Sequence, residues 1–325
     1  MASSFTLAIL SDIHYACAAE QARGSDYEFE IITNPLLRLV FRTYRHFLWM
    51  RHPLQQNPQL DRFLAQVGPV DCVVANGDYC CNTAFVGLSD DATFQSAAEC
   101  LAKLRGKFGD RLRLNFGDHE LGKFSVFGTR GGMLLASWRR ATEELGLQPF
   151  WRAEFGRYVL IGVTSSLIAL PVFAAYTSPV ERPEWERLRE RHLAEIRAAF
   201  GALDPGQRVL LFCHDPTALP FLWREEAVRN KLPQVEQTII GHLHSKLFFG
   251  ASNVLSGLPV IRFLGHSAQR MSTALNEARH WKLFRVRLCP ALAGIELLND
   301  GGYLTAELDS DTRQPARFQF HPLPR

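Results

Sequence analysis

Five short apolar segments of this chain each end in aspartate, histidine or both. They are residues 5–10 before Asp12 and His14, residues 70–75 before Asp78, residues 112–116 before Asp118, His119 and Glu120, residues 209–213 before His214, and residues 238–240 before His242 and His244. Short aliphatic runs bounded by Gly, Asp and Pro are typical of buried strands. Because ligands collect at the carboxyl ends of strands in layered α/β domains, we expect these five ends to meet at one edge of the fold.

The side chains at these strand ends are typical ligands of transition metals. Carboxylate and imidazole together suit Mn²⁺, Fe or Zn²⁺, whereas all-oxygen sites suit Mg²⁺ or Ca²⁺. We expect two divalent ions and favour Mn²⁺, with Fe or Zn²⁺ as alternatives. Two such ions about 3.5–4 Å apart would clamp the attacking and leaving oxygens of an in-line displacement. The pattern therefore predicts hydrolysis of a phosphate ester or anhydride.

The order of the blocks resembles that of the calcineurin-like metallophosphoesterase superfamily, which reads D-X-H, G-D, G-N-H-E/D, H and G-H-X-H. The match extends from about residue 5 to about residue 267. The resemblance implies one metal on Asp12, His14 and His244, a second on Asp118, His214 and His242, and a bridge through Asp78. It further implies that His119 is the general acid or phosphate-orienting imidazole, with Glu120 fixing its ring.

Two positions depart from the family pattern. Asp118 stands where the family has asparagine. A carboxylate still ligates, but three aspartates against two divalent cations leave a charge of about +1, where two would leave about +2. We expect tighter metal binding and weaker attraction for phosphate, and a crippled or one-metal site is the alternative. The Gly-Asp block also lacks a following acidic residue, and we assign Asn82 in that block to substrate contact.

Length and composition favour one large domain. The chain has 325 residues, 47% of them hydrophobic, so we expect a single metallophosphoesterase domain over 1–325. The net charge of +3 does not argue for nucleic acid as a partner. We expect no signal peptide, because the first predicted strand begins at residue 5, and no membrane span, because no stretch is long and apolar enough. Seven cysteines without framework spacing suggest reduced thiols and a cytoplasmic location.

Further segments complete the expected fold. Periodicity predicts helices over 93–108, 132–145 and 183–200. Strands over 259–264, 281–288 and 294–298 are expected to complete a second sheet. The fold class is therefore α/β, a four-layer αββα sandwich with the metals at the carboxyl ends of strands and a helical insertion.

The insertion, residues 15–69, follows the first metal block and should overhang the site. Asn34 and Pro35 give a helix start signal, and no acidic residue follows until after residue 60. A basic, aromatic-rich amphipathic helix of this kind lies readily on an anionic membrane surface. Packing on the domain with solvated arginines is the alternative. We assign the following residues of this helix to substrate contact: Arg38, Phe41, Arg42, Arg45 and Phe47.

In its insertion, the chain resembles the lipid A pathway enzymes that cleave UDP-2,3-diacylglucosamine to the lipid monophosphate and UMP. Two uncharged segments, 166–177 and 216–224, are expected to be loops near the site and suit a lipid-sized pocket. His119 stands where the common short form of that enzyme has arginine, so the resemblance implies a longer variant. We expect a lipid-linked phosphorylated small-molecule substrate and peripheral contact with the inner membrane.

Two other functions compete with this interpretation. One is a soluble phosphodiesterase or phosphatase of the same fold, in which the insertion only packs or dimerises. The other is a non-catalytic scaffold whose metals stabilise the fold and whose insertion binds a partner protein. Every predicted ligand position holds a competent side chain and His119 is present, which argues against the scaffold.

Overall fold

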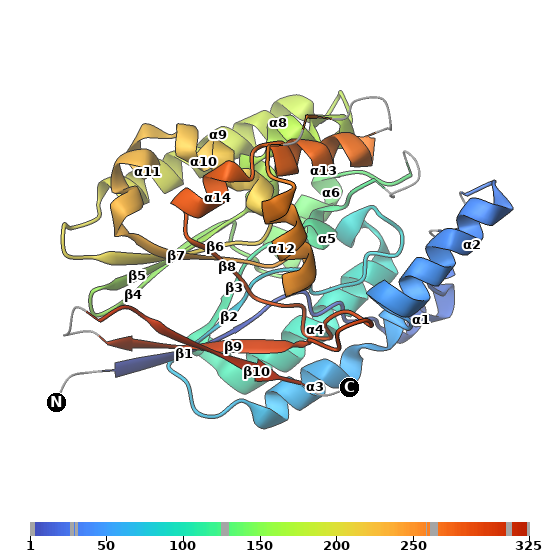
Figure 1. Ribbon diagram of the computed structural model, residues 1–325, viewed down its shortest axis with the longest axis horizontal. Helices are drawn as coiled ribbons and strands as arrows, with labels where there is room; N and C mark the ends of the chain where they lie inside the picture. Colours follow the sequence, from blue (N-terminus) through green and yellow to red (C-terminus); the bar gives the residue numbers. More distant parts are fainter. Residues whose placement is uncertain are drawn as a thin grey trace.

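The computed structural model describes residues 4–26, 29, 32–124, 130–257, 259–260, 266–309 and 314–323. Within these residues the strands form two five-stranded sheets. Figure 1 shows the sheets stacked between two outer layers of helices. The predicted αββα sandwich is confirmed.

Each sheet combines parallel strands with an antiparallel edge. The first sheet contains, in order, β10 (Arg317–Pro322), β9 (Gly302–Asp309), β1 (Ser4–Leu10), β2 (Cys72–Ala75) and β3 (Leu112–Leu114). The second contains β4 (Phe150–Phe155), β5 (Tyr158–Val163), β6 (Arg208–Cys213), β7 (Val235–Ile240) and β8 (Val286–Leu288). Strands β1 to β3 are parallel, as are β5 to β8, so their carboxyl ends lie at one edge of each sheet.

Three long helices form the outer layers. Helices α3 (Asn57–Gln66) and α4 (Asp91–Phe108) cover the first sheet, and α9 (Arg182–Gly201) covers the second. The other helices are α1 (Ala18–Arg23), α2 (Pro35–Tyr44), α5 (Asp118–Leu121), α6 (Leu135–Arg139), α7 (Ser165–Ile168), α8 (Leu170–Phe173), α10 (Leu219–Arg224), α11 (Glu226–Lys231), α12 (Lys246–Val254), α13 (His266–Asn276) and α14 (Arg279–Leu283). The π-helical turns are η2 (Arg45–Trp49) and η6 (Arg140–Glu144), and the 3₁₀ turns are η3 (Pro53–Gln55), η4 (Gly87–Ser89), η5 (Gly109–Arg111), η7 (Ala174–Tyr176), η8 (Pro216–Ala218) and η9 (Leu232–Gln234).

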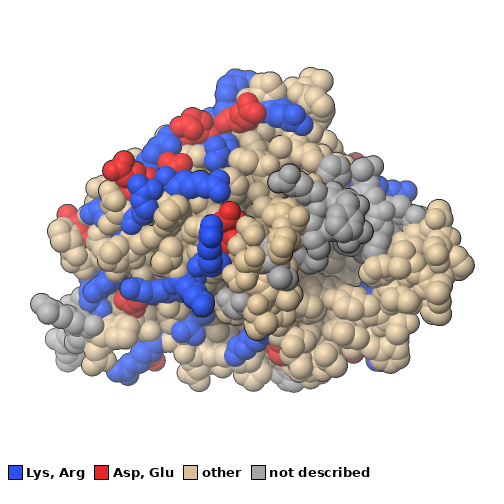
Figure 2. Space-filling model, turned by 45° about the horizontal axis from the view of Figure 1, so that its top comes forward, with Lys and Arg blue, Asp and Glu red and all other residues tan. Residues whose placement is uncertain are grey.

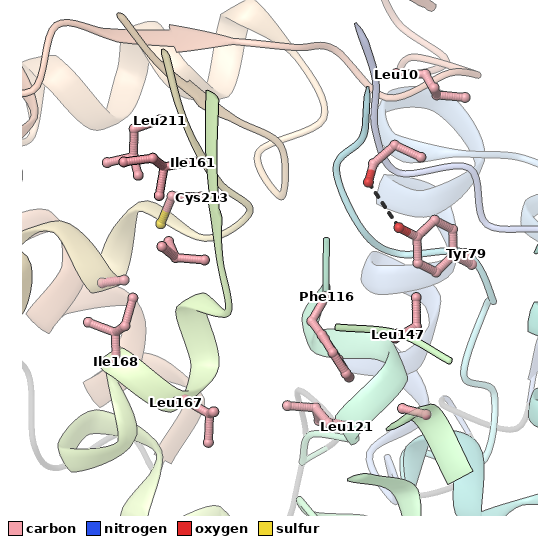
Figure 3. Packing of buried hydrophobic residues seen from close by; sticks show 14 of the residues in the cluster. Leu10, Tyr79, Phe116, Leu121, Leu147, Ile161, Leu167, Ile168, Leu211 and Cys213 are labelled. Carbon is pink, nitrogen blue, oxygen red and sulfur yellow. Dashed lines mark hydrogen bonds between the residues drawn. The ribbon is translucent and has the colours of Figure 1, made fainter. Parts of the chain in front are cut away.

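The central strands are buried on both faces. Leu7 and Ile9 of β1 pack between the sheets with Leu160 and Phe212 of the second sheet. Leu10 belongs instead to the cluster that joins the sheets to the helices, part of which Figure 3 shows. Burial on both faces explains why these strands are continuous apolar runs rather than alternating ones. Each fully buried aliphatic side chain stabilises the fold by roughly 1.5–3 kcal/mol.

The predicted helices are confirmed with adjusted ends, whereas part of the second sheet was predicted wrongly. The predicted helix over 132–145 is split into α6 and η6, while α4 and α9 match closely. Trp281 lies in α14, and of residues 281–288 only Val286–Leu288 form a strand. Residues 294–298 are not a strand, and the predicted strand over 259–264 lies largely outside the described residues. The hairpin of β4 and β5 supplies the missing edge of the sheet.

The two uncharged segments predicted as loops beside a lipid pocket are instead short helices of the core. Residues 166–177 form most of α7 and all of α8, and residues 216–224 form η8 and α10. Leu167 and Ile168 pack among core side chains, as Figure 3 shows, and Phe173 and Leu222 are also fully buried. The expectation that these segments are loops is therefore wrong, and most of their apolar side chains belong to the core.

Candidate metal centre

The loops that follow five strands meet at the carboxyl edges of the two sheets. The amides of Ile13 and His14, after β1, donate to the carbonyl of Asp78, after β2, at 2.9 and 3.0 Å. The amide of His242, after β7 of the other sheet, donates to Asp12 Oδ1 at 3.0 Å. Hydrogen bonds from the backbone therefore hold the loops of both sheets against one another.

A first group of potential ligands consists of Asp12, His14 and His244. The Nε2 atoms of His14 and His244 are 3.2 Å apart, and His244 Nε2 is 3.3 Å from Asp12 Oδ1. Ligands bound to one ion at 2.0–2.2 Å stand about 3 Å apart. The spacing of these atoms therefore suits a common cation.

A second group consists of Asp78, Asp118, His214 and His242. His214 Nε2 is 3.2 Å from Asp78 Oδ2, and His242 Nδ1 is 3.2 Å from Asp118 Oδ1. Asp78 also clusters with His14 of the first group and with His119. The structure thus brings together all seven predicted ligands, with Asp78 adjoining both groups.

The hydrogen bonding of His214 tests whether this site suits a cation. His214 Nδ1 lies 2.6 Å from the carbonyl oxygen of Asn76, which can only accept, so Nδ1 carries the hydrogen. In the neutral ring, Nε2 then turns a lone pair toward the Asp78 carboxylate. Burial acts to lower the pKa of His214, but Asp78 and Asp12 raise it well above its usual range. The negative charges of the two aspartates favour a positive charge between the His214 ring and the Asp78 carboxylate, and a divalent metal ion would supply it.

Several of these residues also have an unusual backbone conformation. The φ angles of His14, His242 and His244 are 50°, 61° and 57°, and those of Asp12 and Asp78 are 52° and 58°. Left-handed backbone is uncommon outside glycine and costs roughly 1–2 kcal/mol per residue. Such strain persists only where the surroundings impose it, and it clusters at functional sites. The fold therefore holds these five side chains in place at the expense of backbone stability.

Two glycines of the motifs are required by close packing. A Cβ atom on Gly117 would lie 2.0 Å from Asp78 Oδ1, and one on Gly241 would lie 2.5 Å from Asp12 Oδ2. Any larger residue would push a ligand carboxylate out of position. The glycines in the G-D-H-E and G-H-X-H blocks thus allow loops from different strands to touch.

His119 is oriented by a carbonyl oxygen and by a lysine. Its Nδ1 donates to the carbonyl of Cys80 at 3.1 Å, because a carbonyl can only accept. Its Nε2, 2.6 Å from Lys123 Nζ, accepts a hydrogen bond from the ammonium group. Burial lowers the pKa of His119 to about 3, against the opposite effect of Asp78. A neutral His119 therefore holds its single ring hydrogen on Nδ1, away from Lys123.

The expectation that Glu120 fixes the ring of His119 needs correction. Its buried carboxylate accepts hydrogen bonds from the amides of Gly117 at 2.7 Å, Tyr79 at 2.8 Å and Asp78 at 3.1 Å. The Tyr79 hydroxyl in turn lies 2.9 Å from the carbonyl oxygen of Ala75, the bond dashed in Figure 3. Glu120 therefore ties two metal-binding loops together through their backbone.

Four of the predicted substrate contacts outside the metal centre have partners within the protein. Asn82 is buried, and its Oδ1 accepts from the amide of Gly87 at 2.8 Å, so it braces a turn. Arg42 and Arg45 each reach a carboxylate oxygen of Asp26 at 2.8 Å. Arg38 donates to a backbone carbonyl of its own chain at 2.6 Å. Asn82 and the three arginines are thus engaged within the protein.

The two aromatic residues of the set differ from each other. Phe41 is half-buried, and the Phe47 side chain is 57% exposed. Phe47 belongs to η2, which carries the chain from α2 toward the metal centre. Of the predicted substrate contacts, Phe47 is therefore the one that faces solvent most openly.

Three residues of the centre were not anticipated from the sequence. Trp49, at the end of η2, has its ring centroid 4.6 Å from that of His244, with the two ring planes tilted by 37°. Asp215 Oδ2 lies 3.9 Å from His242 Nε2, which is close for an ion pair and too long for a hydrogen bond. Lys123 lies between Asp118 and His119. Asp215 directly follows a motif histidine and could have been suspected, whereas Trp49 and Lys123 belong to no motif.

No family model and no curated protein matches this chain. Among solved structures, it is similar to a purple acid phosphatase from yellow lupin seeds, at 11% identity and a TM-score of 0.42, over 98% of this chain and 54% of that chain. It is also similar to a putative 5′-nucleotidase from Staphylococcus aureus, at 13% identity and a TM-score of 0.42, over 99% and 54%. A third is a predicted phosphoesterase from Streptococcus pneumoniae, at 12% identity and a TM-score of 0.27, over 99% and 100%. The chain thus spans about half the length of the first two.

Proposed function

We propose that this chain is a two-metal-dependent hydrolase of phosphate esters or anhydrides. The observation that carries the proposal is the pair of ligand groups that share the environment of Asp78, all of them buried or half-buried carboxylates and imidazoles. When bound, two divalent ions would activate the attacking water and stabilise charge on the phosphate oxygens. Mn²⁺ is the metal we would add first, with Fe or Zn²⁺ next.

The residues around the ligands have separate roles in this proposal. Asp78 accepts from the amide of His119 at 3.0 Å, which fixes the carboxylate toward both ligand groups. Glu120 clamps the loops that carry Asp78 and Asp118, so the ligand atoms are preorganised. His119 and Lys123 lie beside the ligands, and we assign their polar side chains to contact with the substrate phosphate.

We further propose that the substrate is lipid-linked, with UDP-2,3-diacylglucosamine as the first candidate. Support comes from α2, which projects from the end of the molecule in Figure 1 and has no buried residue. Its apolar side chains face solvent: Leu36, Leu37, Leu39 and Val40 are 45–69% exposed. Its two arginines bind groups of their own chain, Arg38 a backbone carbonyl and Arg42 the carboxylate of Asp26. In Figure 2 the corresponding end of the molecule carries few charged side chains.

A membrane or a lipid chain suits this surface better than a second copy of the protein. Helix α2 has 10 residues and is about 15 Å long. One face of so short a helix falls short of the roughly 800 Å² that each partner contributes to a stable dimer. A lipid surface needs no complementary shape. No helix in the described parts of the chain is long and apolar enough to cross a membrane.

The exposed helix and the metal centre are connected through Trp49. Its ring lies 4.6 Å from that of His244 and 5.4 Å from that of Phe248. Its carbonyl accepts from the amide of Glu296 at 2.8 Å, which anchors the end of η2. The head group of a lipid whose acyl chain lies along α2 would then approach the ligand groups at the end of η2, where Trp49 contacts His244.

The decisive experiment is hydrolysis of UDP-2,3-diacylglucosamine in detergent with Mn²⁺, with UMP release followed by mass spectrometry. An aryl phosphodiester serves as the soluble substrate, Asp78→Asn as the inactive variant and Asp110→Asn as a matched surface control. Metal-dependent UMP release supports the whole proposal. Turnover of the aryl diester alone retains a phosphohydrolase and rejects the lipid, as the soluble alternative predicts. If Mn²⁺, Fe and Zn²⁺ bind without turnover of either substrate, the scaffold alternative holds.

A further inference from the structure

Lys123 contacts Asp118, the residue at which the sequence departs from the phosphoesterase pattern. Its Nζ is 3.3 Å from Asp118 Oδ2 and 2.6 Å from His119 Nε2. Asp118 is buried, with 2% of its side chain exposed, whereas 22% of the Lys123 side chain is exposed. The Lys123 side chain is therefore more accessible to an incoming phosphate than the ligand carboxylate beside it.

The backbone fixes Lys123 in this place. Helix α5 ends at Gly122, whose φ is 94° and where an added Cβ would lie 2.3 Å from the carbonyl oxygen of Gly132. The amide of Lys123 then donates to the carbonyl of Phe85 at 3.0 Å. The chain thus turns back sharply after the helix, and the lysine side chain reaches over the residues that begin it.

The contact between Lys123 and Asp118 changes the net charge of the metal-loaded centre. Two divalent cations and the three carboxylates of Asp12, Asp78 and Asp118 sum to about +1, and the ammonium of Lys123 restores about +2. The value of +2 is the one that two carboxylates with a neutral side chain at position 118 would leave. Attraction for a phosphate dianion depends on this net charge.

We propose that Asp118 and Lys123 act as one unit, in which the lysine cancels the charge of the aspartate and offers its ammonium group to the substrate phosphate. This inference rests on the proposed function. Asp118 strengthens the hold on the cation, and Lys123 keeps the centre attractive to an anion. Lys123 is thus a phosphate-binding residue, and it is needed because residue 118 is an aspartate.

The test is a cycle of Lys123→Met, Asp118→Asn and the double variant in the Mn²⁺-loaded protein. Binding of inorganic phosphate and of Mn²⁺ is measured by calorimetry, with Lys107→Met on the exposed end of α4 as a matched control. We expect Lys123→Met to weaken phosphate binding about tenfold or more, and to leave Mn²⁺ binding equal or tighter. Adding Asp118→Asn should return phosphate binding to within about threefold of the parent.

Opposite effects on cation and anion separate this role from damage to the fold, which would weaken both. Unchanged phosphate binding in Lys123→Met, or a further loss on adding Asp118→Asn, overturns the inference. If Lys123→Met does not fold, Asp118→Asn alone decides, because it should bind phosphate more tightly and Mn²⁺ more weakly. A parent protein that binds no metal rejects the proposed function itself, whereas a metal-loaded, active parent with an indifferent Lys123 rejects only the inference.

Discussion

The metal centre and helix α2 invert the usual distribution of side chains in opposite directions. At the centre, charged or ionisable groups are buried, with Asp12 and His214 at 0% exposure. On α2, apolar groups are exposed, with Leu36 at 69% and Leu39 at 60%. Buried charges are retained where they are paired or bind metal, and exposed apolar patches mark interaction surfaces. Each region thus indicates a partner of its own kind, a cation in one case and an apolar chain in the other.

The comparison predicts that the two regions respond to different measurements, and the largest effect belongs to the metal centre. Asp78→Asn removes the charge that both ligand groups share, so Mn²⁺ affinity and hydrolysis of every substrate should fall by more than about 100-fold. This exceeds the usual effect of losing a residue that only supports a ligand. Calorimetry with Mn²⁺ and initial rates test this. Retained metal binding and activity in Asp78→Asn would show that the two groups do not work as one centre.

The next effect belongs to α2. Leu39→Asp with Phe47→Asp places charge on the exposed apolar side and removes no buried contact, because both side chains are more than half exposed. We expect turnover of the lipid substrate to fall about tenfold, which corresponds to about 1.4 kcal/mol, with hydrolysis of the aryl diester and the melting temperature unchanged. Val180→Asp, at an apolar position that is 89% exposed and lies just before α9, is the matched control. Equal loss on both substrates would contradict the division between the regions.

Trp49 joins the two regions, so its removal should affect both. Trp49→Ala deprives the His244 ring of its neighbour and loosens the end of η2. We expect a severalfold fall in kcat/KM for the aryl diester and a larger fall for the lipid. Combined with Phe47→Asp, the losses on the lipid should be less than additive, because both changes disturb one path. Strict additivity in this double-mutant cycle would indicate that Trp49 and Phe47 contribute independently to turnover of the lipid.

Much of the centre was predictable because its information is local. The ligands lie in the loops that follow parallel strands, which end at one edge of each sheet, so the positions of Asp12, Asp78 and His214 followed from apolar runs and motif order. The left-handed backbone of His14, His242 and His244 was not predictable, because φ depends on hydrogen bonds between loops far apart in the sequence. The same holds for Lys123, whose contacts arise from a turn after α5 that no motif marks.

The orientation of α2 was beyond the sequence for a different reason. Periodicity shows that Arg38, Arg42 and Arg45 share a face, but it does not show which face meets the protein. Asp26, which lies before the helix, decides this by binding two of the arginines. The edge strand β4 was missed for a similar reason. Its polar residues Arg152 and Glu154 interrupt the apolar pattern, and the strand forms by pairing with Tyr158–Val163.

The smallest effect concerns a buried histidine, His192, whose pKa moves in the opposite direction to that of His214. His192 on α9 accepts from the amide of Thr164 at 3.0 Å, and burial lowers its pKa despite the nearby Glu195. In the unfolded chain this ring takes up a proton near pH 6.5, whereas in the folded chain it does so only at lower pH. The unfolded state therefore binds more protons below pH 6.5, and the free energy of unfolding should fall there by up to about 1.4 kcal/mol per pH unit. His192→Gln, which keeps an acceptor for Thr164, should remove this part of the slope between pH 6.5 and 5 in urea titrations. An unchanged slope would mean that His192 is already protonated in the folded protein between pH 6.5 and 5, in contradiction to the effect of burial on its pKa.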